Sequence, residues 1–154
     1  MKSFALFLVI FLLGVCGYLA LQGRLPSQAN LSTPIYLVSP ETCLLNKGIC
    51  TAGKAPFQLS LELTPQPVPL MKPVQVRMQL QGLNNLASAN LKIEGENMYM
   101  GFQTVQLAKL NESDWQGNFS LPICSTSEMH WRVTANLTAP QQAYQASFKL
   151  VTQR

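Results

Sequence analysis

The chain has 154 residues, of which 47% are hydrophobic and only 12% are charged. Soluble domains are usually about a quarter charged, so this composition excludes a long disordered chain and indicates that part of the sequence is not made for water. The net charge of +4 comes from 11 Lys and Arg against 7 Asp and Glu, without a run of basic residues, which argues against nucleic-acid binding.

The chain begins with an apolar segment, residues 4–21, that contains no charged residue. As a helix it would be ~27 Å long at about 1.5 Å per residue, close to the ~30 Å hydrocarbon core of a bilayer. We therefore predict an N-terminal transmembrane anchor over residues 1–24. Because Gln22-Gly23-Arg24 offers no small-residue cleavage site, a cleaved signal peptide is the second interpretation. Leu13-Gly14-Val15-Cys16 allows a third, a lipoprotein signal.

Residues 25–34 are small and polar and include two prolines, which predicts a short extended tether. The remaining residues, 35–154, form the predicted domain. All three interpretations of the N-terminus place this domain outside the cytoplasm. Four Asn-x-Ser/Thr sequons would also fit a eukaryotic glycoprotein; they begin at Asn30, Asn111, Asn118 and Asn136.

Two cysteines at the start of the domain bracket a turn. Between Cys43 and Cys50, the sequence Asn46-Lys47-Gly48 allows the chain to reverse. In an oxidising compartment we predict a disulfide between them, since the spacing fits neither a C-x-x-C redox pair nor a zinc site. Cys124 is then left as a buried free thiol, a metal ligand or an alternative disulfide partner. Cys16, in the apolar segment, is expected to be an inert thiol.

From residue 57 onward, apolar residues recur at every second position, which is typical of strands with one buried face. Proline, glycine and asparagine clusters separate these segments. Several short strands over about a hundred residues predict an all-β fold, an immunoglobulin-like antiparallel β-sandwich, with a small barrel as the second architecture. The alternating segments are 57–64, 74–81, 91–94, 129–137 and 146–150.

Sulfur-bearing residues gather in the second half of the chain. Thioether, thiolate and imidazole groups are the ligands that suit Cu(I). Met98 and Met100, two apart on one strand, would point the same way, and a neighbouring strand with Cys124, Met129 or His130 would complete a three-coordinate site. His130 and Met129 fall on opposite faces, so both would bind one ion only at a bulge. The candidate copper ligands are therefore Met98, Met100, Cys124 and Met129.

The competing interpretation places these methionines in the core, where methionine packs well. Met98 and Met100 share strand parity with Phe102, as Met129 does with Trp131.

An enzyme is not expected, because the chain has one His and one Asp and lacks a G-x-S-x-G motif. Glu94 and Glu96 have the spacing of a carboxylate pair on one strand face. Gly95 between them favours a turn, which makes two solvated acids the preferred interpretation.

Three short motifs resemble a known family. Met98-Tyr99-Met100-Gly101, Gly117-Asn118-Phe119 and Met129-His130-Trp131-Arg132-Val133 follow one another in a layout similar to that of the YtkA-like and FixH-related membrane-anchored proteins of bacteria, over residues 55–150. The resemblance implies an immunoglobulin-like sandwich, an association with copper handling or cytochrome oxidase assembly at the membrane, and methionines as soft-metal ligands. This chain departs from the pattern by its cysteines and by having no histidine beside the first motif.

Together these features predict a single-pass protein of the bacterial inner membrane with the bulk of the chain in the periplasm. We expect a non-enzymatic domain that assists a membrane metalloprotein, with copper as the candidate cofactor. The alternative is a protein-interaction module of the same fold that binds its partner through a sheet face or edge and holds no metal.

Overall fold

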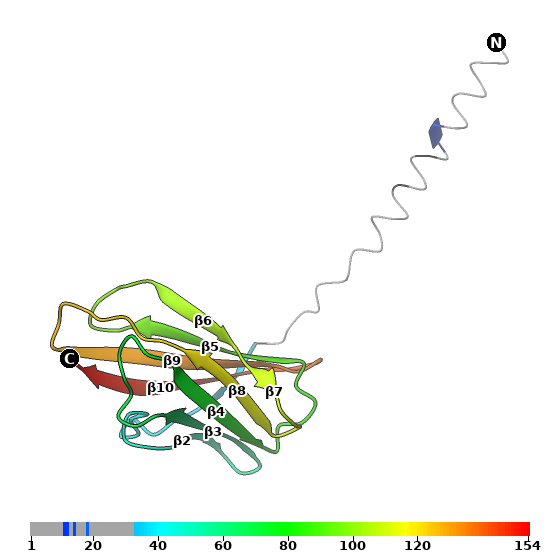
Figure 1. Cartoon of the computed structure of the whole chain (residues 1–154). Helices are drawn as coiled ribbons and strands as arrows, with labels where there is room; N and C mark the ends of the chain where they lie inside the picture. The colour runs from blue at the N-terminus through cyan, green and yellow to red at the C-terminus, as the bar shows by residue number, and fades with distance from the viewer. Residues whose placement is uncertain (1–10, 13, 15–17, 19–32) are drawn as a thin grey trace. The chain divides into compact units, whose positions relative to one another are not determined.

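The structure is a computed structural model that describes a few N-terminal residues and everything from Thr33 onward, namely residues 11, 12, 14, 18 and 33–154 (Figure 1). The predicted anchor, residues 1–24, and most of the predicted tether, residues 25–34, lie outside the described residues and stay predictions. Among the residues that are described, no helix has both the length and the apolar character needed to cross a membrane.

The chain divides into two units, Met1–Asn30 and Leu31–Arg154, and the strands of the described residues all lie in the second. Within residues 33–154, ten strands form two five-stranded sheets that lie as two layers in a sandwich-like arrangement (Figure 1). The first sheet has the order β1-β10-β9-β5-β6 and the second β2-β3-β4-β8-β7. The strands are β1 (Ile35–Leu37), β2 (Cys50–Lys54), β3 (Phe57–Thr64), β4 (Val74–Gln81), β5 (Ser88–Gly95), β6 (Phe102–Gln106), β7 (Ala108–Lys109), β8 (Asp114–Phe119), β9 (Glu128–Thr138) and β10 (Ala143–Gln153).

The core lies between the sheets and is built by the predicted alternation. In β3 the apolar residues Leu59, Leu61 and Leu63 are completely buried, while the residues between them are half-buried. In β9, Val133 and Ala135 occupy the matching inner face of the other sheet. Burial of each such leucine contributes about 1.5–3 kcal/mol. The all-β, two-sheet part of the prediction is thus confirmed.

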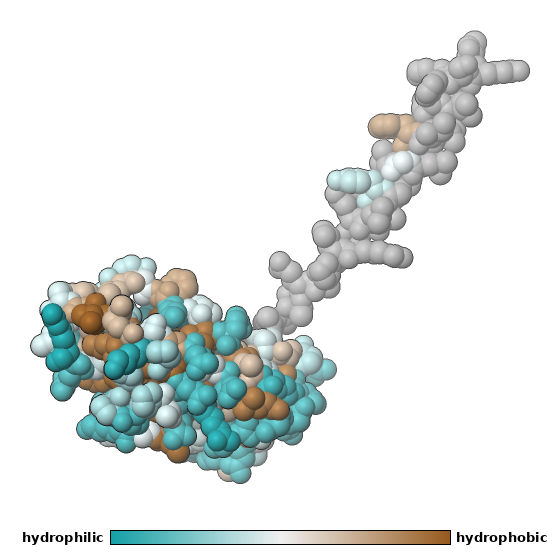
Figure 2. Space-filling model, viewed as in Figure 1, coloured by the Kyte–Doolittle hydropathy of each residue, from teal (hydrophilic) through white to brown (hydrophobic). Residues whose placement is uncertain are grey.

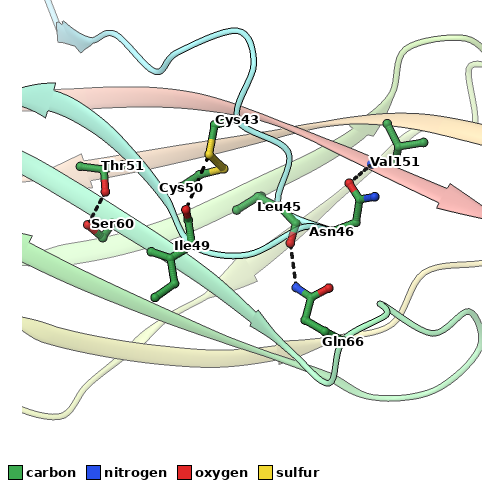
Figure 3. The surroundings of a disulfide bond; sticks show 9 residues. All are labelled: Cys43, Leu45, Asn46, Ile49, Cys50, Thr51, Ser60, Gln66 and Val151. Carbon is green, nitrogen blue, oxygen red and sulfur yellow. Dashed lines mark hydrogen bonds between the residues drawn. A yellow bond between two sulfur atoms is a disulfide. The ribbon is translucent and has the colours of Figure 1, made fainter.

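The predicted disulfide joins Cys43, in the loop after β1, to Cys50, the first residue of β2 (Figure 3). Inside this covalent ring Leu45 is fully buried, and its amide donates to the carbonyl of Lys149 in β10 at 2.9 Å. Gln66, in the loop that follows β3, donates to the Leu45 carbonyl at 2.8 Å. The disulfide loop is therefore bonded to both layers.

The two ends of the sandwich differ. The chain enters at Ile35, which pairs with Tyr144 of β10, and Tyr144 pairs with Leu137 of β9. At the other end of β9, Trp131 pairs with Gly95, the last residue of β5. Six residues of β9 separate these ends, or ~20 Å at about 3.3 Å per residue. The loop that joins β5 to β6 lies at the end far from the chain entry (Figure 1).

Candidate functional site

The predicted strand carrying Met98 and Met100 is wrong. β5 ends at Gly95 and β6 begins at Phe102, so both methionines lie in the connecting loop. Gly101 adopts a φ of 78°, in the left-handed region that an alternating strand does not use. The two side chains consequently do not share a face: Met98 is half-buried against the core, whereas Met100 is 42% exposed.

The start of this loop is fixed to β9 by hydrogen bonds. The Glu96 amide donates to the His130 carbonyl at 2.8 Å. The side chain of Asn97 then accepts from the His130 amide at 3.0 Å and donates to the Glu128 carbonyl at 3.0 Å. Asn97 thereby replaces the backbone pairing that β5 has lost, and it holds the following methionines at the end of the sheet.

Met100 lines a pocket of about 290 Å³ together with a second methionine, Met71. Met71 comes from the loop between β3 and β4 and is 67% exposed. The apolar part of the pocket lining includes Ile93, Phe102, Leu121 and Trp131. In Figure 2, hydrophobic residues gather at the end of the domain that carries the loop from β5 to β6. Two flexible thioethers from different loops thus border one apolar hollow.

The backbone of Met71 is held in an unusual conformation. Its φ is 57°, a left-handed value that costs a non-glycine residue about 1–3 kcal/mol. Its amide donates to the Leu121 carbonyl at 2.8 Å, and Leu70 forms a parallel bridge with Leu121. This pairing ties the loop from β3 to the segment after β8 and places Met71 beside the pocket. Met71 was not predicted from the sequence; the available signal was a large apolar residue in a proline-rich turn, where no core requires one.

Trp131 supplies a rigid wall of the pocket. It is 4% exposed, and its indole Nε1 donates to Thr152 Oγ1 at 3.0 Å. The polar atom of the ring is therefore satisfied within the core.

The other predicted ligands lie elsewhere. Met129 is 3% exposed and Cys124 is 6% exposed, both within the core cluster, and Cys124 is a free thiol. A β carbon on Gly95 would lie 3.1 Å from the Met129 Cε atom and would collide with the Met98 carbonyl oxygen, so these two methionines meet at Gly95. Of the four predicted ligands, all within the described residues, Met100 alone lines this pocket.

The polar groups around the site are engaged with one another. His130 is exposed on the face opposite Met129, as its parity predicts, and its Nε2 lies 2.7 Å from Glu128 Oε1. Hydrogen bonds from Gln153 and then from His130 lower the pKa of Glu128. Within residues 33–154 and the four described N-terminal residues, no three His, Cys, Asp or Glu side chains are grouped to hold a metal ion.

Glu94 and Glu96 do not form a free carboxylate pair. Glu94 pairs with Lys92 at 2.7 Å, and Glu96 pairs with Arg132 at 2.6 Å. Each carboxylate is partly exposed in an ion pair with its own cation, which agrees with the interpretation as two solvated acids.

A second hollow lies where the edge strands of the two layers meet. β1 continues into Val38, whose carbonyl accepts from the Gly53 amide of β2 at 2.9 Å. The hollow beside this link has a volume of about 540 Å³ and is lined in part by Tyr36, Val38, Lys54 and Phe57. Tyr36 is 68% and Val38 78% exposed, which is unusual for adjoining apolar residues of one surface.

No protein-family model matches the chain, and neither does any curated protein sequence. Among solved structures, the chain is similar to a crystal structure of an engineered protein, with 20% identity and a TM-score of 0.44. The match covers 64% of this chain and 21% of the other.

Proposed function

We propose that this chain is a non-enzymatic domain tethered to the outer side of a bacterial inner membrane, where it handles Cu(I) for a membrane metalloprotein. The observation that carries the proposal is the shared pocket of Met71 and Met100, two methionines from separate loops that are both substantially exposed. A core-packing role would have buried them, since methionine in cores fills internal gaps.

We also propose that the two-sheet fold is an immunoglobulin-like sandwich. Two facing, mainly antiparallel sheets of this size are the layout of such sandwiches. The resemblance of the methionine motifs to YtkA-like and FixH-related proteins supports the same fold and the same association with copper. The proposed ligand set differs from the predicted one. Met100 is kept and Met71 is added, whereas Met129 and Cys124 belong to the core and Met98, packed against the core, does not line the pocket.

The chemistry of the pocket suits a transient Cu(I) carrier. Thioethers are neutral, soft ligands that bind Cu(I) well and bind harder ions such as Mg²⁺ poorly, because those ions prefer oxygen ligands. Two protein ligands leave a coordination position open, so a partner can add its own ligand before the first two release the ion. Trp131 borders the same pocket, and a tryptophan ring attracts a cation that lies over its face.

The test is a Cu(I) competition titration of the full-length chain in detergent micelles. The double variant Met71→Leu/Met100→Leu keeps the apolar volume and removes both sulfurs. We expect its Cu(I) affinity to fall by at least about tenfold, the loss typical of disturbing even an outer contact of a metal site. Met98→Leu is the matched control, because Met98 lies in the same loop but does not line the pocket. An unchanged affinity in the double variant would refute copper binding at this pocket.

A protein-interaction module without metal is the second candidate, favoured by the apolar lining of the same pocket. The leucine variants separate the two functions, because a pocket for a partner's apolar side chain tolerates leucine. Met71→Glu together with Met100→Glu would abolish partner binding in that case.

A further inference from the structure

We infer that the edge surface rests in the headgroup region of the lipid bilayer. We define the edge surface as Tyr36, Val38, Lys54 and Phe57, which line one hollow, together with Ile35, the residue before Tyr36 in β1. The inference rests on the proposed membrane tether but not on copper binding. It adds a second contact between the protein and the membrane, made by the folded domain itself.

The first argument is the exposure of these side chains. Ile35 is 44%, Tyr36 68%, Val38 78% and Phe57 40% exposed, although each is large and apolar. Tyr36, Val38 and Phe57 line one hollow, so their exposure is a continuous feature and not a scatter of single residues. A continuous exposed apolar surface of this kind indicates that another molecule or a membrane covers it.

The second argument is the kind of residue. Tyrosine is enriched at membrane–water interfaces, because its ring is apolar and its hydroxyl group remains hydrated. Lys54 borders the same hollow, and its long side chain can cover apolar groups while its ammonium meets lipid phosphates. None of the residues that line the hollow is acidic. Glu94 lines an adjoining hollow with Tyr36 and Val38, but its carboxylate is paired with Lys92 at 2.7 Å. The combination of apolar, aromatic and cationic side chains is therefore complementary to an anionic lipid surface.

The third argument is the length of chain before β1. From residue 24 to Ile35 the chain spans at most ~40 Å, at about 3.3–3.6 Å per residue. The edge surface begins at the first strand residue, so it is the folded surface nearest along the chain to the proposed anchor. Tethering makes contact with the bilayer intramolecular, so even a weak affinity of this small surface suffices to keep it occupied.

The position of the two hollows agrees with this assignment. Ile35 lies at the end of the first sheet where Tyr144 and Leu137 pair, whereas Met100 lies beyond the opposite end of β5. Contact of the edge surface with lipid therefore leaves the methionine pocket accessible to a partner.

The experiment places a fluorescent probe on each end of the domain. Full-length Tyr36→Trp and Tyr99→Trp are reconstituted in vesicles of phosphatidylcholine and phosphatidylglycerol, with and without brominated acyl chains. Tyr99 is the matched control position, since it is 85% exposed and lies in the loop from β5 to β6. The wild-type signal of Trp115 and Trp131 is subtracted. We expect the indole introduced by Tyr36→Trp to be quenched several-fold more strongly than the one introduced by Tyr99→Trp. Adding Val38→Asp to the Tyr36→Trp protein should remove the difference.

Two further outcomes separate this inference from the tether on which it rests. If wild-type protein floats with the vesicles but the probe of Tyr36→Trp is quenched no more than that of Tyr99→Trp, the edge surface does not contact lipid, and a protein partner becomes its occupant. If the wild-type protein does not float with vesicles at all, both the membrane tether and the lipid contact of the edge surface are refuted.

Discussion

At the scale of single residues, the position of each methionine is decided by whether a strand continues or ends. Met129 follows the perfect alternation of β9, and its place on the buried face was predictable from Trp131 and Val133. Met100 was misplaced, because parity is meaningful only within a strand and the strand ends at Gly95. The sequence could single out Met71 as an apolar residue in a turn but could not place it at the pocket, since its neighbour Leu121 is brought close only by the tertiary pairing of two loops.

The hydrogen bond between Trp131 and Thr152 gives a residue-scale prediction. Thr152→Val keeps the shape of the side chain but leaves the buried indole Nε1 without its acceptor, which should lower the free energy of unfolding by about 1–3 kcal/mol. Thr152→Ser retains the hydroxyl group and is the control. Urea unfolding followed by tryptophan fluorescence measures both. Equal stability of Thr152→Val and wild type would show that the bond contributes nothing.

Asp114 gives a prediction of pH dependence. Hydrogen bonds from Asn111, then from Gln79 and Arg77, lower the pKa of Asp114 below its ordinary value of 3.8. A carboxylate with a lowered pKa in the folded state stabilises the protein above its unfolded pKa, and this stabilisation is lost as the pH falls through the folded value. Asp114→Asn should therefore be less stable than wild type at neutral pH, and the difference should shrink below about pH 4. Chemical unfolding across that range is the measurement; a difference independent of pH would contradict the assignment.

At the scale of elements, the strands with strict alternation were predicted well. The segments 57–64 and 74–81 coincide with β3 and β4, and the segment 129–137 lacks only one residue at each end of β9. Five strands, β1, β2, β6, β7 and β8, lie outside the predicted alternating segments. β1 and β2 were missed because three- and five-residue edge strands contain too few positions to reveal a period. The pairing of β1 with β10 was also inaccessible, since it joins residues at opposite ends of the domain.

The end of β5 offers an element-scale prediction. A methyl group at Gly95 would collide with the Met98 carbonyl and press on the Met129 side chain, so Gly95→Ala should displace the loop from β5 to β6. Crowding of this kind in a packed region costs about 1–3 kcal/mol of unfolding free energy. Tyr99→Ala, at an exposed position of the same loop, should change stability by less than about 0.5 kcal/mol. Denaturant midpoints of the two variants test the expectation, which fails if their stabilities are equal.

The disulfide loop gives a second prediction at this scale. Cys43 and Cys50 are separated by seven positions, and closing so short a loop contributes about 2–3 kcal/mol by restricting the unfolded chain. Cys43→Ala together with Cys50→Ala should lower stability by this amount and make it insensitive to reductant. Cys124→Ala is the control, since Cys124 is a free thiol and wild-type sensitivity to reductant should persist. Retained sensitivity in the double variant would point to another disulfide in the protein.

At the scale of the whole molecule, the two proposals concern two separate hollows. The edge surface begins where the chain enters, beside the pair Tyr144 and Leu137, and the methionine pocket is lined by Trp131, six residues away along β9. The sequence predicted two layers but not which loops share an end, because that depends on strand order. The proposed copper ligands and the proposed membrane contact are therefore properties of topology more than of local pattern.

The attachment of the first strand has a mechanical consequence. β1 is parallel to β10, so a pull on the N-terminus loads the hydrogen bonds between these two strands in shear. In shear several hydrogen bonds must break together, whereas in unzipping they break one at a time. Behind β1, the covalent ring of Cys43 and Cys50 is bonded to β10 through Leu45. If β1 peels away under tension, extension should stop at that ring, which leaves the remaining strands folded.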